Sequence, residues 1–135
     1  MPLDELPVHD IPALSGNSAP VHQEDVFDNL TVIGQVPADL NGLYVRNGPN
    51  AFYTPDWRYH AYDGDGMLHA VRFRQGQVSY RNRWVQTSGL QEERAAGQAL
   101  WKGLKEPMRK DRPDQPLKNT SNTDIKYHAG RLISM

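Results

Sequence analysis

The clearest pattern of hydrophobic and polar positions along the chain is an alternation with a period of two. It covers residues 68–74 and 77–85, which are separated only by Gln75-Gly76. Two alternating runs joined by a two-residue loop are typical of a β-hairpin, and such a loop fixes the register. One face then carries the pairs Phe73/Val78, Val71/Tyr80 and His69/Asn82, and we predict that this face is buried.

The segment before this hairpin has weaker periodicity. Residues 1–29 are rich in Pro, Asn, Asp and Ser without any regular period, which predicts an extended N-terminal arm. Residues 30–36 form a short β-type run, residues 37–42 have the composition of a turn, and residues 43–46 predict a second strand. Asn47-Gly48-Pro49-Asn50 is expected to end that strand.

After the hairpin the pattern changes to that of one short helix and a second hairpin. Ser88 and Gln91 have the spacing of a capping box, with Glu92 and Glu93 following in the first turn, so a helix of about three turns is expected between residues 88 and 104. Residues 105–118 are rich in Pro and charge and predict a surface loop. Strands are expected at residues 123–127 and 132–135, with residues 128–131 as their turn, and the predicted class is therefore all-β.

Composition limits the functions that the chain can have. Its 135 residues suffice for one domain, and 15 Lys and Arg balance 16 Asp and Glu, so nothing indicates a nucleic-acid-binding arm or a charged membrane patch. The absence of cysteine leaves His, Asp, Glu and Tyr to carry chemistry. The N-terminus has no apolar run of the kind found in a signal or membrane segment, and we expect a cytoplasmic protein.

The last predicted strand ends in the apolar run Leu132-Ile133-Ser134-Met135. An edge strand of this kind needs a neighbour on its open side, and no further strand follows in this sequence. We therefore expect residues 1–135 to be the N-terminal part of a longer protein.

The acidic stretch Asp63-Gly64-Asp65-Gly66 is the most distinctive local motif. A calcium loop beginning at Asp63 would need an oxygen ligand at its fifth position and an acid at its twelfth, where Met67 and Arg74 stand. A dinucleotide-binding loop would need a third glycine and a following helix. We predict a tight turn instead, in which Gly64 and Gly66 permit positive φ and the two aspartates can accept backbone N–H groups within the loop.

The residues alone indicate neither a metal site nor a catalytic site. No pair of histidines has the spacing that places two ligands on one face of a strand or helix, and the serines at 79, 121 and 134 lack a nucleophile elbow. His69, in the predicted hairpin, is interpreted as a core residue rather than a ligand. The five histidines are His9, His22, His60, His69 and His128.

Several motifs, taken in order, resemble the carotenoid cleavage oxygenase family, which includes carotenoid, apocarotenoid and stilbene dioxygenases. The matching stretches cover the chain from about residue 30 to its end, and their order and spacing are more specific than any one of them. They are VPADLNGLYVRNGPN at 36–50, HAYDGDGMLH at 60–69, YRNR at 80–83, NTSNT at 119–123 and HAGRL at 128–132.

This resemblance implies part of a seven-bladed β-propeller, with residues 1–29 as an arm and residues 30–135 as the N-terminal part of the oxygenase domain, truncated at its C-terminus. The full-length enzyme would cleave a conjugated C=C bond of an apolar polyene or stilbene-like substrate with O₂, using Fe(II) held by four histidines, and would contact membranes peripherally to extract its substrate. Those histidines lie beyond residue 135, so His60 and His69 are not assigned to iron. Residues 1–135 alone are expected to bind no iron and to be inactive.

By the same resemblance, Thr123 lies near the open coordination site of the iron, where its methyl group limits access. The alternative for Thr123 is a β-branched strand residue that faces a neighbouring strand. Two alternatives stay open for the protein: a non-catalytic β-rich module that binds a ligand or partner, and an isomerase of the same family.

Overall fold

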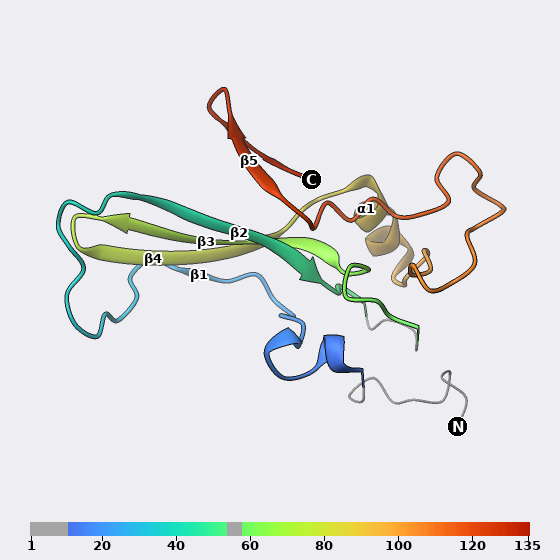
Figure 1. The fold of residues 1–135 in the computed structure, drawn as a ribbon, viewed down its shortest axis with the longest axis horizontal. Helices are drawn as coiled ribbons and strands as arrows, with labels where there is room; N and C mark the ends of the chain where they lie inside the picture. Colours follow the sequence, from blue (N-terminus) through green and yellow to red (C-terminus); the bar gives the residue numbers. More distant parts are fainter. Residues whose placement is uncertain (1–10, 54–57) are drawn as a thin grey trace.

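The computed structural model describes residues 11–53 and 58–135, which form two antiparallel β-sheets and one α-helix (Figure 1). Among these residues no helix is both long and apolar enough to cross a membrane. In chain order the elements are the 3-10 turns η3 (Pro12–Leu14) and η4 (Gly16–Ser18), strands β1 (Val26–Phe27), β2 (Gly42–Asn50), β3 (Asp65–Arg74) and β4 (Gln77–Trp84), helix α1 (Ser88–Ala96), and strands β5 (Ile125–His128) and β6 (Arg131–Ser134).

The main sheet has the order β1-β4-β3-β2, and the β3–β4 hairpin at its centre confirms the predicted register. Gln75 and Gly76 both have positive φ, 50° and 79°, as the tight hairpin turn requires. Val78, Asn82 and Trp84 on the predicted inner face are buried, and Met67 opposite Trp84 is fully enclosed. Alternation therefore located both the hairpin and its buried face.

Strand β2 is longer than predicted, because Asn47-Gly48-Pro49-Asn50 continue it instead of ending it. All four residues pair with β3, from Asn47 opposite Leu68 to Asn50 opposite Asp65. Pro49 is tolerated because β2 is the last strand of the sheet and needs no donor on its outer side. The stretch has the composition of a turn, but it continues the strand because an edge strand accepts such residues.

The strand predicted at residues 30–36 is wrong. A single backbone hydrogen bond, from Leu30 N to Val78 O, links this segment to β4. Ile33 is completely exposed, and the outer edge of β4 is already occupied by β1, which pairs Val26 with Arg81. Within the described residues this β-type run therefore pairs with no strand beyond that one bond.

Two buried asparagines fasten the N-terminal arm to the sheet. The Asn50 side chain accepts from Val21 N at 2.7 Å and donates to Val21 O at 2.8 Å. The Asn82 side chain accepts from Asp25 N at 2.6 Å and donates to Gln23 O at 2.9 Å. Each side-chain amide thus accepts from one backbone N–H of the arm and donates to one backbone carbonyl, as a neighbouring strand would. These bonds hold the described part of the arm against the sheet.

Helix α1 forms where predicted, but its cap differs. The side chain of Thr87, not Ser88, accepts the N–H of Leu90 at 3.2 Å, and the helix ends at Ala96 before Gly97 in the left-handed conformation. With the start one residue earlier, Glu92 and Glu93 fall beyond the first turn. Glu93 is instead buried, and its partners are described below.

The second hairpin, β5–β6, turns at Ala129 and Gly130 and not over residues 128–131, so His128 pairs with Arg131 inside the ladder. It projects away from the main sheet in Figure 1. The segment that leads into it is linked to β2 by the Asn47 side chain, which donates to Ser121 O at 2.9 Å and to Asp124 O at 3.0 Å.

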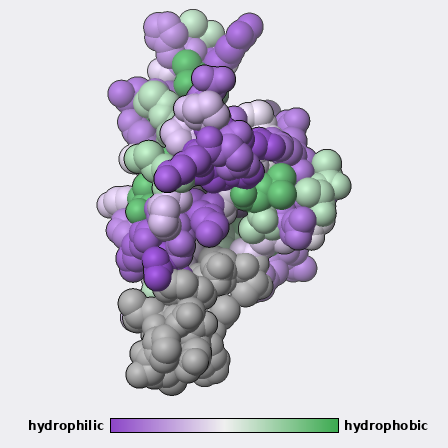
Figure 2. All heavy atoms as spheres, turned by 90° about the vertical axis from the view of Figure 1, so that its right-hand side faces the viewer, coloured by the Kyte–Doolittle hydropathy of each residue, from purple (hydrophilic) through white to green (hydrophobic). Residues whose placement is uncertain are grey.

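The hydrophobic core consists of two small clusters beside the main sheet. One contains Met67, Trp84 and Leu90 and packs α1 against the hairpin; the other joins Ile11 and Leu14 to Ala51 and Tyr59. The predicted loop at residues 105–118 has no regular secondary structure. The side of the molecule on which this loop lies is mainly hydrophilic, with small and separate hydrophobic groups (Figure 2).

Candidate functional site

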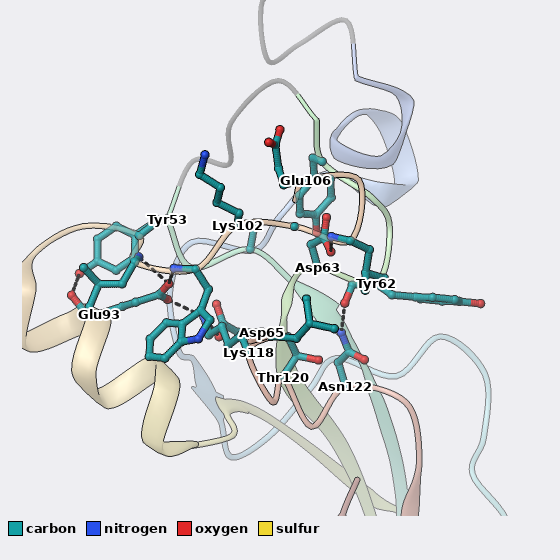
Figure 3. A pocket seen from close by; sticks show the side chains of 18 of the residues that line it. Tyr53, Tyr62, Asp63, Asp65, Glu93, Lys102, Glu106, Lys118, Thr120 and Asn122 are labelled. Carbon is teal, nitrogen blue, oxygen red and sulfur yellow. Dashed lines mark hydrogen bonds and ion pairs between the residues drawn. The ribbon is translucent and has the colours of Figure 1, made fainter. Parts of the chain in front are cut away.

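A hollow of about 580 Å³ lies between the β2–β3 connection, the C-terminal half of α1 and the loops on either side of residue 118 (Figure 3). Aromatic and aliphatic side chains form part of its wall, and charged groups gather at its base. The lining includes Tyr53, Tyr59, Asp63, Asp65, Glu93, Leu100, Trp101, Leu104, Lys118 and Thr123.

The glycines of Asp63-Gly64-Asp65-Gly66 serve close packing, and neither Gly64 nor Gly66 uses the positive φ that glycine permits. A Cβ on Gly66 would lie 2.2 Å from Ser121 O, and one on Gly64 would lie 2.7 Å from both Asn50 N and the Tyr59 hydroxyl. Gly66 N donates to Thr120 O at 2.8 Å. The motif therefore brings the 119–123 segment into direct backbone contact with β3.

The turn that begins this motif is held from both sides. Asp63 accepts from His60 N at 2.7 Å, as predicted, and also from Leu104 N at 2.8 Å, outside the loop. From the other side, the buried Asn122 donates to Tyr62 O at 2.8 Å and to Gly64 O at 2.7 Å. Hydrogen bonds thus connect this turn to two other parts of the chain, the loop at Leu104 and the segment at Asn122.

A buried ion triad lies at the base of the hollow. Lys118 Nζ pairs with Asp65 Oδ1 and with Glu93 Oε2, and the side chains of Lys118, Asp65 and Glu93 are only 9%, 6% and 4% exposed. Glu93 Oε1 accepts from Leu100 N at 2.9 Å and Trp101 N at 3.2 Å. Burial raises the pKa of Asp65 above its ordinary value, although Lys118 opposes this rise.

Tyr59 is expected to lose its phenol proton at a higher pH than an ordinary tyrosine. Burial, together with the negative charges of Asp63 and Asp65, raises its pKa from 10.0 to about 12. Between these values the unfolded chain loses the phenol proton and the native state keeps it, so the free energy of unfolding falls as the pH rises through this window. An alkaline titration in the ultraviolet tyrosinate band should show a late group that Tyr59→Phe removes; loss of a group titrating near pH 10 would contradict the assignment.

Thr123 lies at the hollow, just before β5, and is not in a strand, so its alternative interpretation as a strand residue is wrong. Its side chain is exposed, and its hydroxyl donates to Asn122 Oδ1 at 3.1 Å. Its backbone N–H donates to Met135 O at 2.8 Å. Thr123 therefore belongs to a segment that the bonds of Asn122 and Gly66 hold against the start of β3.

The histidines do not form a metal site within the described residues, which contain no group of three or more His, Asp or Glu side chains able to hold an ion. His69 Nδ1 is 2.7 Å from the Tyr80 hydroxyl, and burial, with Arg46 nearby, lowers its pKa. The Nδ1 of His60 accepts from Tyr62 N at 3.2 Å. His22 and His128 are exposed, and His9 lies outside the described residues. Fe(II) therefore does not fit the side chains described here.

The triad and Asn122 were not predicted from the sequence. Lys118 ends a stretch whose composition is that of a solvated loop, and Glu93 has the appearance of a surface helix residue. No local pattern distinguishes them from exposed charges, because their burial depends on partners 25 residues or more away in the chain. Only the motif resemblance directed attention to the 119–123 segment.

Comparisons with known proteins cover nearly the whole chain. A family model described as retinal pigment epithelial membrane protein matches residues 18–135. Carotenoid 9,10(9',10')-cleavage dioxygenase 1 of Phaseolus vulgaris is 35% identical over 138 residues, covering 90% of this chain and 25% of the relative. Lignostilbene-alpha,beta-dioxygenase isozyme III of Sphingomonas paucimobilis is 33% identical over 128 residues, covering 93% of this chain and 26% of the relative.

A solved structure of a dioxygenase is also similar to this chain. The crystal structure of Pseudomonas brassicacearum lignostilbene dioxygenase matches with a TM-score of 0.78 and 29% identity, covering 94% of this chain and 27% of that chain. This confirms the predicted fold class, part of a seven-bladed β-propeller. The chain spans about a quarter of the length of these relatives. Together these matches show that the chain belongs to the carotenoid oxygenase family.

Proposed function

We propose that the protein to which residues 1–135 belong is a non-haem iron(II) dioxygenase that cleaves a conjugated C=C bond of a carotenoid, apocarotenoid or stilbene-like substrate with O₂. The observation that carries this proposal is the family match over residues 18–135. The named activities of the relatives, carotenoid cleavage and lignostilbene dioxygenation, support the substrate class. Residues 30–135 are proposed as the N-terminal part of the oxygenase domain, with the arm before them.

The reaction is balanced without a further reductant. The alkene carbon–carbon double bond breaks, each of its carbons receives one oxygen atom, and the four electrons that reduce O₂ come from that bond. Two carbonyl products result. Iron(II), when bound, supplies O₂ activation, and we propose that its ligands lie outside the described residues, which offer no suitable group.

This segment contributes a wall to the proposed reaction chamber. Leu100 and Trp101 line the hollow together with Thr123, which suits an apolar substrate that must be kept from water. We propose that the Thr123 methyl group restricts access of small molecules to one side of the iron. The residues of this chain would thus shape the chamber and exclude water, while the metal is held elsewhere.

The experiment that tests the function uses protein expressed from the complete reading frame that contains residues 1–135. The Fe(II)-loaded protein is incubated with stilbene and apocarotenoid substrates under isotopically heavy O₂, and the products are analysed by mass spectrometry. Two aldehydes that each carry one heavy oxygen atom are expected. An isomerised substrate without heavy oxygen would indicate the isomerase instead, and an unchanged substrate that binds stoichiometrically would indicate a binding module.

We further propose a cytoplasmic enzyme that contacts membranes peripherally through the loop after α1. Leu104 and Met108 in this loop are 53% and 63% exposed, and Lys102 and Lys110 beside them are exposed cations. This combination suits the boundary between headgroups and acyl chains. Co-sedimentation with phospholipid vesicles that Leu104→Ser and Met108→Ser weaken together would support the contact, and unchanged sedimentation would contradict it.

A further inference from the structure

We propose that Lys118 is a positioning residue for Thr123: the Asp65–Lys118–Glu93 triad, rather than the β5–β6 hairpin, sets where the 119–123 segment lies at the wall of the hollow. This inference rests on the proposed function for its kinetic consequence. Its structural consequence can be tested without any activity.

The triad joins side chains from three separate parts of the chain: β3, α1 and the loop that ends at Lys118. Asp65 begins β3 and accepts from Phe52 N at 3.4 Å, so it is tied to the segment that directly follows β2. Glu93 belongs to α1 and holds the turn at Leu100 and Trp101 through its second oxygen. Lys118 joins both carboxylates from the loop, and therefore fixes the point at which the chain enters the 119–123 segment.

The aliphatic part of Lys118 is also confined. A Cβ on Gly89 would lie 3.0 Å from Lys118 Cγ and 3.5 Å from Cε, so the lysine stem lies directly against the first turn of α1. The side chain is 9% exposed in total. Both the stem and the ammonium group are thus held, which a surface lysine paired with one carboxylate would not be.

From Lys118 to Thr123 the chain has little freedom. Two residues after Lys118, Thr120 O accepts from Gly66 N, and Ser121 N donates to Asn119 Oδ1 at 3.1 Å. Asn122 then bonds the Tyr62 and Gly64 carbonyls, and Thr123 follows directly. A shift at Lys118 is therefore transmitted to Thr123 through a short and hydrogen-bonded segment.

The β5–β6 hairpin is bonded to this segment, since Ser121 Oγ donates to Ser134 Oγ at 2.9 Å and Thr123 N donates to Met135 O at 2.8 Å. Most side chains of the hairpin are exposed, and the Asn47 bonds reach Ser121 O and Asp124 O, before β5, so we expect the hairpin to move with the segment rather than to hold it against the main sheet. Removing the Lys118 charge leaves Asp65 and Glu93 buried together without a cation, which costs far more than the loss of an exposed pair. We expect the 119–123 segment to move away from the two carboxylates as a result.

The structural test compares Lys118→Met with Lys118→Arg, which keeps the charge, in protein from the complete reading frame. Hydrogen exchange of the Gly66 amide reports on its bond to Thr120 O, and that of the Thr123 amide reports on its bond to Met135 O. About tenfold faster exchange is expected at both amides in Lys118→Met, with rates near wild type in Lys118→Arg. Unchanged exchange at Gly66 in Lys118→Met would overturn the inference.

Glu93→Gln provides a second variant in case Lys118→Met does not fold. It keeps an oxygen acceptor for the Leu100 and Trp101 amides but removes one of the two charges that hold Lys118. Faster exchange at Gly66 and Thr123 is expected here too, and protection equal to wild type would count against the inference. Lys126→Met is the matched control, because this lysine is 66% exposed and its pair with Asp124 is 3.7 Å long.

The kinetic test is a double-mutant cycle with Thr123→Ala. If Lys118 acts through Thr123, Lys118→Met lowers kcat/KM for O₂ about tenfold in the wild-type background but has little further effect beside Thr123→Ala. Equal effects in both backgrounds would show a merely structural role and overturn the inference. A wild-type protein without oxygenase activity would refute the proposed function alone, since the exchange results would still decide the role of the triad.

Discussion

Replacing Asn82 with alanine is expected to lower the free energy of unfolding by about 3 kcal/mol, because it removes a buried side chain that bonds partly buried backbone groups of the arm. Asn82 is 1% exposed, and its side chain is bonded to Asp25 N at 2.6 Å, Gln23 O at 2.9 Å and Met67 Sδ at 3.5 Å. The arm pairs with β4 over only two residues in β1, so the lost bonds are a large part of its attachment. Urea-induced unfolding measures the loss of stability, and hydrogen exchange of the Asp25 amide measures the weaker attachment of the arm.

Asn41→Ala is the matched control for this prediction. Asn41 also bonds backbone groups through its side chain, donating to Ala38 O and Asp39 O and accepting from Gln75 N, but it is exposed to solvent. Water replaces these bonds, and the expected loss is below about 1 kcal/mol. Equal losses in the two variants would mean that burial of the arm contacts does not decide the effect.

The contrast between these asparagines shows what sequence patterns can and cannot predict. The β3–β4 hairpin was predictable because alternation and a two-residue loop are local properties that determine register and buried face together. The role of Asn82 was not, because its partners lie 57 and 59 residues away in a segment with no period. An asparagine in a strand is otherwise unfavourable, so its position alone gave only a weak signal.

Less of the candidate site than of the fold could be predicted from the sequence. Resemblance directed attention to Thr123, and the structure places it at the hollow, while its chemical role stays a prediction. Lys118 and Glu93 could not be recognised, since a charged residue in a Pro-rich loop and one on a short helix are usually solvated. A similar ambiguity affected the interpretation of Gly64 and Gly66, because glycine serves both positive φ and close approach. Only the neighbouring atoms, Asn50 N for Gly64 and Ser121 O for Gly66, show that close approach is the reason here.

Gly66→Ala is expected to cost about 3 kcal/mol and to separate the 119–123 segment from β3. The new Cβ would lie 2.2 Å from Ser121 O and 2.9 Å from Thr120 O, and these are backbone atoms that cannot swing aside as a flexible side chain does. Their positions are also fixed, because Thr120 O accepts from Gly66 N and Ser121 O accepts from Asn47 Nδ2. The clash therefore breaks hydrogen bonds in addition to displacing the segment that carries Thr123.

Gly48→Ala separates this clash from the general effect of placing alanine in a strand. Gly48 lies in the adjacent strand β2, opposite Met67, and a Cβ there would meet nothing within 4 Å. Its free energy of unfolding should stay within about 0.5 kcal/mol of wild type, whereas Gly66→Ala should unfold at clearly lower urea. Hydrogen exchange of Thr123 should accelerate in Gly66→Ala only. Equal stability and equal exchange in the two variants would show that the 119–123 segment yields easily, and that close approach does not account for glycine at position 66.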